Sequence, residues 1–78
     1  MDIEILSSSG TIYSGRVSSV SVPGIGGSFT ILKHHAPILS LLSPGEVYVE
    51  TGDHQNLSFQ VAGGVVEVKK NRIVVLSE

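Results

Sequence analysis

The 78-residue sequence contains no cysteine and no tryptophan. The absence of cysteine excludes disulfide bonds and thiolate metal sites, so the fold must be stabilised by packing or by a partner. Only 5 lysine and arginine residues stand against 7 aspartate and glutamate residues, and they form no extended basic run. This charge balance argues against nucleic acid as the main partner and against direct adhesion to anionic lipid.

Long apolar runs and targeting patterns are missing as well. No apolar run approaches the length of about 18 residues that a membrane span needs. Met1 leads directly into an alternating pattern, without the charged and apolar regions of a signal peptide. These features favour the cytosol. The length supports one domain, residues 1–78, and a hydrophobic fraction of 41% suffices for a single core.

No catalytic motif is recognisable in the sequence. Serine is abundant, yet there is no G-x-S-x-G nucleophile elbow and no serine in a recognisable arrangement with a base. The glycine-rich stretch 24–27 lacks the lysine and the following helix of a phosphate-binding loop, which favours a hairpin turn. We therefore expect no catalytic residue, no cofactor site and no metal site.

Short alternating segments separated by turns run through the whole chain. Strands are expected over residues 2–7, 11–13, 17–22, 29–32, 38–42, 46–50, 57–61, 65–68 and 73–76. The doubled serine Ser18-Ser19 is expected to mark a bulge, and Gly63-Gly64 a bulge or a close backbone approach. No window carries a helical stripe free of glycine and proline. This regular spacing indicates an all-β fold, an antiparallel sandwich or barrel without a helical hairpin.

The segment 38–42 places four large apolar residues, Ile38, Leu39, Leu41 and Leu42, in five positions. It has no clear period, so it fits a strand or one helical turn, and we expect a strand. A small sandwich buries one face of a strand easily and two faces only with difficulty. Two interpretations stay open: the segment is buried on both faces, or part of it lies on a partner-binding surface.

The histidines His34, His35 and His54 suggest a different class of function. Adjacent strand residues face opposite sides, so His34 and His35 could share a metal ion only from a loop, with His54 or a carboxylate as third ligand. A cupin-like metal enzyme is one hypothesis. The plainer interpretation is a corner histidine bonded to the backbone beside Pro37.

A free-standing binding module for a peptide or a sugar is a second alternative. It would need a concave pocket with an aromatic floor, and the sequence offers only Tyr13, Phe29, Tyr48 and Phe59 for that purpose.

Several short motifs follow one another in register. They are Tyr13-Ser14-Gly15, Val22-Pro23-Gly24 with Gly27, His35-Ala36-Pro37-Ile38-Leu39, Pro44-Gly45, and the run from Val61 to Val68, VAGGVVEV. None is specific alone. Together, and with the ending Val75-Leu76-Ser77-Glu78, they resemble the N-terminal domain of the epsilon subunit of F-type ATP synthases over the whole chain.

The resemblance implies a ten-stranded β-sandwich in the central stalk of the rotor. Such a subunit is non-catalytic: it joins the gamma subunit to the ring of c subunits and couples proton or sodium flow to ATP synthesis. The positions that it assigns to gamma are Ser7, His35, Ala36, Pro37 and Ser40. The positions that it assigns to the c ring are Gly26, Gly27 and Ser28.

The resemblance also implies a peripheral location at the cytoplasmic face of the bacterial inner membrane, held there by protein partners. We expect the isolated domain to be a monomer. Two residues depart from the family pattern, because Lys33-His34 stand where Pro-Gly is common and Ser28 stands where a carboxylate is frequent. Many members continue into two C-terminal helices that inhibit ATP hydrolysis or bind ATP, and neither property is carried over to these 78 residues.

Overall fold

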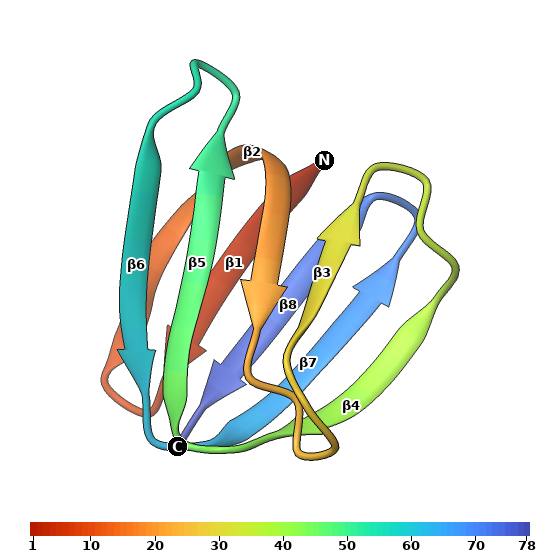
Figure 1. The fold of residues 1–78 in the computed structure, drawn as a ribbon. Coiled ribbons are helices and arrows are strands. Elements are labelled where there is room, and N and C mark those ends of the chain that lie inside the picture. Colours follow the sequence, from red (N-terminus) through yellow and green to blue (C-terminus); the bar gives the residue numbers. More distant parts are fainter.

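Eight strands make up the regular structure of residues 1–78, all of which the computed structural model describes (Figure 1). They are β1 Asp2–Ser7, β2 Gly10–Val22, β3 Phe29–Leu32, β4 Ile38–Leu42, β5 Gly45–Thr51, β6 Asn56–Val61, β7 Gly64–Lys69 and β8 Arg72–Ser77. The sequence predicts nine segments because it divides β2 in two, and the family resemblance implies ten. The all-β class and the strand over 38–42 are confirmed. No helix that could cross a membrane is present.

The strands form two facing sheets that share β2. Sheet A has the order β4-β7-β8-β1-β2, and sheet B has the order β3-β2-β5-β6. Every pair is antiparallel except β1 and β8, which run parallel with Ile3 opposite Ile73 and Leu6 opposite Leu76. The predicted antiparallel sandwich is confirmed, with this one parallel pair as an exception. The parallel pair arises because two hairpins, β1–β2 and β7–β8, join along their first and last strands.

A bulge at Ser18 lets β2 pass from sheet A to sheet B. The pairing of β2 with β5 shifts register between Val17 and Ser19, and the Ser18 hydroxyl donates to the carbonyl oxygen of Glu50 at 3.2 Å. Val17 and Val20 are both buried although they are three positions apart, which regular alternation does not allow. The bulge that the doubled serine predicts is confirmed, and Figure 1 shows β2 curving between the two sheets.

The core between the sheets consists almost entirely of β-branched side chains. This composition suits strands, because a branched β-carbon packs well on a pleated surface. On one side of the core the rings of Tyr13 and Phe59 pack together, with their centroids 5.0 Å apart. The buried apolar residues are Ile3, Ile5, Val17, Val20, Val22, Ile31, Leu42, Val47, Val49, Val61, Val66, Val68, Ile73 and Val75.

Only glycine fits at position 64, the first residue of β7, where the backbone of β8 passes very close. The φ of Gly64 is +138°, and a Cβ atom at this position would lie 1.9 Å from the carbonyl oxygen of Leu76. The close backbone approach that the sequence predicts at Gly63-Gly64 is therefore confirmed. Gly24 has a similar role in the turn after β2, where a Cβ atom would lie 2.7 Å from both the Gly27 carbonyl oxygen and the Phe29 ring.

We predict that Gly64→Ala lowers the free energy of unfolding by at least about 3 kcal/mol, because strain at positive φ adds to a backbone clash. Gly26→Ala is the matched control, since its Cβ would have no neighbour within 4 Å and its φ is not positive. We expect the control to change stability by less than about 1 kcal/mol. Urea denaturation followed by circular dichroism measures both, and equal midpoints for the two variants would contradict this role of Gly64.

Candidate functional site

Apolar side chains form a row across the outer face of sheet A. Register aligns Leu6 of β1 with Leu76 of β8, Leu76 with Val65 of β7, and Val65 with Leu41 of β4. Leu41 is 58% exposed and Leu76 is 51% exposed, while Leu6 and Val65 are half-buried. Single exposed leucines are common on protein surfaces, but a contiguous row over four strands is typical of a partner-binding surface.

Two further residues extend this row. Leu39 lies two positions before Leu41 on the same face of β4 and is 73% exposed. Ile12 lies in the bulge of β2 opposite Leu6 and is 42% exposed. We call the set Leu6, Ile12, Leu39, Leu41, Val65 and Leu76 the apolar face. The open question about segment 38–42 is thereby answered: Leu42 is buried and Ile38 packs against the core, while Leu39 and Leu41 point outward.

Charged residues border the apolar face at one end. Asp2 pairs in register with Arg16 and with Arg72, and Arg72 pairs with Lys69. The Arg72 guanidinium donates to the Glu4 carboxylate, and Arg16 Nε lies 3.8 Å from Asp2 Oδ1. An apolar centre with a polar rim is the usual anatomy of a protein–protein interface.

The five positions assigned to gamma do not form one small cluster. Ser7 ends β1, beside the end of sheet A where Leu42 pairs with Gly64. The corner His35-Ala36-Pro37 is exposed and precedes β4, so it lies at the opposite end of sheet A. Ser40 is half-buried in β4 and pairs with the buried Val66. One partner could touch all five only by covering the sheet from end to end.

The positions assigned to the c ring lie in the exposed turn between β2 and β3. Gly24 of this turn forms an isolated bridge with Leu42, and the Ile25 N–H donates to the carbonyl oxygen of Leu41 at 3.0 Å. The turn carrying Gly26, Gly27 and Ser28 therefore lies against the end of β4. In Figure 1 it is the orange-yellow loop at the bottom, beside the yellow-green strand β4.

The three histidines do not converge. His54 Nδ1 lies 3.5 Å from a Glu50 carboxylate oxygen in the β5–β6 loop. His35 Nδ1 lies 2.9 Å from the carbonyl oxygen of Ala36, so the expected corner histidine bonded to the backbone is observed. No group of three histidine or carboxylate side chains is close enough to hold a metal ion. The cupin-like hypothesis is therefore wrong.

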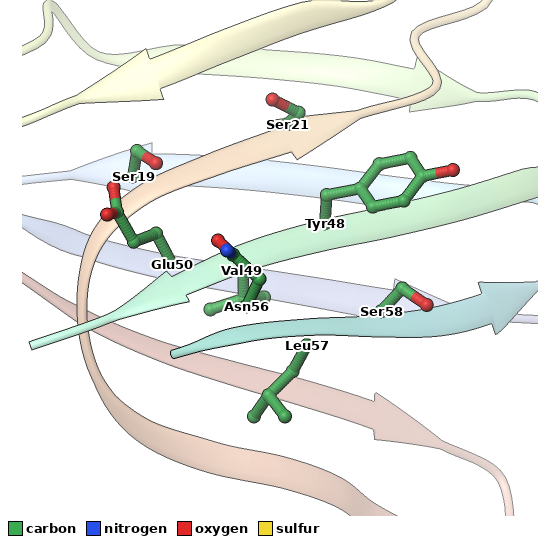
Figure 2. A pocket seen from close by; sticks show the side chains of 8 residues that line it. All are labelled: Ser19, Ser21, Tyr48, Val49, Glu50, Asn56, Leu57 and Ser58. Atoms are coloured by element: carbon green, nitrogen blue, oxygen red, sulfur yellow. The ribbon is translucent and has the colours of Figure 1, made fainter. Parts of the chain in front are cut away.

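The outer face of sheet B is polar and carries one exposed aromatic ring. Register places Thr30, Ser21, Tyr48 and Ser58 in a row across the four strands, and the Ser21 and Thr30 hydroxyls are 2.8 Å apart. Figure 2 shows Tyr48 between Ser21 and Ser58. These residues line an open depression with a volume of about 470 Å³. The other three aromatic rings pack against the core, so the aromatic floor that a peptide or sugar module needs is absent.

The family model for the ATP synthase delta/epsilon chain β-sandwich domain matches residues 1–78. The chain is 44% identical to the ATP synthase epsilon chain 1 of Methylococcus capsulatus, over all of its own length and 56% of that relative. It is 38% identical to the ATP synthase epsilon chain of Chlorobaculum tepidum, over 97% of its own length and 86% of that relative.

Solved structures show the same fold at low sequence identity. A chain of the mitochondrial ATP synthase of Euglena gracilis, solved with OSCP, F1 and the c ring, superposes with a TM-score of 0.87 at 16% identity. That match covers 96% of this chain and 48% of the other. A chain from the central stalk and c ring of the Tetrahymena thermophila enzyme gives a TM-score of 0.80 at 18% identity, covering 99% and 62% of the two chains.

The fold and its outer surfaces thus define a β-sandwich domain of the kind found in rotary ATP synthases. The chain belongs to the ATP synthase delta/epsilon chain family, and it corresponds to the N-terminal β-sandwich domain of the epsilon chain. That subunit is non-catalytic. The chain spans about half the length of the Methylococcus relative and most of the length of the Chlorobaculum relative.

We predict that the double variant Leu39→Gln, Leu41→Gln keeps the stability of the parent within about 0.5 kcal/mol for each substitution, because both side chains are already in water. The same variant should bind less of a fluorescent dye that reports exposed apolar surface. A matched control, Val66→Ala, removes core packing and should cost about 1–3 kcal/mol. Loss of stability in the glutamine variant as large as in the control would show that the apolar face is part of the core.

Proposed function

We propose that this chain is a non-catalytic rotor subunit of an F-type ATP synthase, which joins gamma to the c ring and couples ion flow to ATP synthesis. The observation that carries this proposal is the apolar face on a chain of the delta/epsilon family. In support, the matching solved chains come from assemblies described as F1 with the c ring and as central stalk with the c ring. Residues 1–78 act in this proposal as one domain.

The apolar face is proposed to bind gamma. Exposed leucine side chains gain roughly 1.5–3 kcal/mol each when they are buried against a partner. Since the apolar face reaches from β4 to β1, a partner that covers it would also reach Ser7 at one end and His35, Ala36 and Pro37 at the other. Ser40, on the edge strand β4, would lie at the border of this contact.

The turn with Gly26, Gly27 and Ser28 is proposed to contact the polar loops of the c ring. Two backbone hydrogen bonds tie this turn to β4 and together form the Gly24–Leu42 bridge. The Ile25 N–H donates to the Leu41 carbonyl oxygen at 3.0 Å, and the Ser43 N–H donates to the Pro23 carbonyl oxygen at 2.8 Å. Because β4 also carries Leu39 and Leu41, the two proposed contacts share one strand. A force on the turn would thus pass directly to the gamma-binding sheet.

Attachment to the membrane is proposed to be indirect, through gamma and the c ring. In a bacterium this would place the subunit at the cytoplasmic face of the inner membrane. The largely polar outer face of sheet B and the net charge of −2 fit a peripheral subunit that stays out of the lipid.

We predict that Leu41→Glu weakens association with gamma at least about tenfold, because a charge would be buried in an apolar contact. Tyr48→Ser, on the outer face of sheet B, is the matched control and should associate as the parent does. Co-purification of tagged variants with the organism's own gamma and c subunits measures both. Equal recovery of gamma with Leu41→Glu and with Tyr48→Ser would move the gamma surface away from sheet A.

Substitutions at the assigned corner test the border of the same contact. Pro37→Ser should reduce recovery of gamma while the isolated domain keeps its thermal unfolding midpoint, because Pro37 is exposed. Ser40→Arg should also reduce recovery of gamma, and the isolated domain should stay folded because Ser40 lies on an edge strand. Unchanged recovery for both variants would remove the corner from the proposed surface.

A further inference from the structure

All 5 basic residues lie at one end of the molecule. Arg16, Arg72 and Lys69 share a register row with Asp2, at the end of sheet A opposite Leu42 and the β2–β3 turn. Lys70 follows in the β7–β8 turn, and Lys33 follows β3. The chain has a net charge of −2, so this end is a local concentration of positive charge on an acidic protein.

Two loops meet at this end and hold the lysines together. The His34 N–H donates to Asn71 Oδ1 at 3.1 Å, which joins the β3–β4 loop to the β7–β8 turn. Figure 1 shows these two loops side by side at the upper right. Lys33, His34, His35, Lys69 and Lys70 all lie within two residues of this bond, and we call them the basic tip.

The lysines of the basic tip have no carboxylate partner. The ion pairs of the chain engage Arg16, Arg72 and His54 only. Asp2 and Glu4 of sheet A pair with the two arginines. Glu67, two residues before Lys69 on the same face of β7, is the one further carboxylate close to the tip in sequence.

Lys70 has a positive φ, a backbone conformation that is unfavourable for lysine. Lys70 and Asn71 form the two-residue turn between the paired Lys69 and Arg72, with φ values of 48° and 63°. Positive φ at both positions is typical of a type I′ turn, which favours asparagine, aspartate or glycine. The turn thus carries a charge in place of a residue that would fit its backbone better.

We propose that the basic tip binds an acidic, carboxylate-rich segment of a partner protein. Unpaired lysines on two joined loops can reach carboxylates spaced along an extended segment, whereas a compact anion such as phosphate is usually held by converging backbone N–H groups. At the junction of the two loops the N–H of His34 is already occupied by Asn71, and the chain has no helix N-terminus. The tip lies far from the β2–β3 turn, so this contact is independent of the proposed c-ring contact.

Titration of the 78-residue protein with a short fluorescent peptide of alternating aspartate and glutamate tests the proposal at low salt. Binding should weaken as salt is raised, because exposed charges are screened. Lys70→Asn should weaken binding about fivefold, as expected for loss of an exposed charge that meets more than one carboxylate. The same substitution should leave the thermal midpoint unchanged or raise it, because asparagine fits the turn. Lys70→Arg should keep the affinity of the parent.

Arg16→Gln is the control with the same net charge as Lys70→Asn, and it should bind the peptide as the parent does. Equal weakening in both variants would show a nonspecific response to net charge and would overturn the proposal. Absence of peptide binding at low salt would also overturn it. Two other results would also overturn the proposal, because each identifies another class of ligand. One is displacement of the peptide by inorganic phosphate at equal charge concentration. The other is tighter binding to phosphatidylserine vesicles than to the peptide.

Discussion

The bulge at Ser18 is the constraint on which the two-sheet arrangement depends. It allows β2 to present Val17 and Val20 to the same core while its first half pairs with β1 and its second half with β5. Without the extra residue, strict alternation would turn one of these valines toward water. A chain of 78 residues can thereby enclose one core between two sheets without a long connection or a helix.

The two outer faces left by this arrangement differ in chemistry. Sheet A exposes a row of leucine and isoleucine side chains, bordered by ion pairs, whereas sheet B exposes serine, threonine, one tyrosine and a single leucine, Leu32. Burial of the sheet A side chains against a partner is favourable, and the hydroxyl row of sheet B is already well solvated. This difference is the reason to propose the outer face of sheet A, and not that of sheet B, as the gamma-binding surface; β4 joins that face to the β2–β3 turn.

Much of the fold could be predicted from the sequence, because alternating residues and turn glycines are local signals. The strand bounds other than the division of β2, the bulge at Ser18 and the close approach at Gly64 follow from such signals. The parallel pairing of β1 with β8 could not be predicted, because it joins segments some seventy positions apart. The apolar face was missed for the same reason: Leu6 and Leu76 become neighbours only when register is known. The excess of leucine in 38–42 was its one visible signal.

The central claim is that gamma covers the outer face of sheet A and leaves sheet B in water. The chain has no cysteine, so single substitutions Leu39→Cys and Tyr48→Cys each supply one unique thiol on an exposed site. The rate of maleimide labelling, compared between the isolated protein and the assembled complex, measures which face is covered. We predict strong protection of the cysteine at position 39 and none at position 48. Equal labelling of position 39 in both states would contradict it.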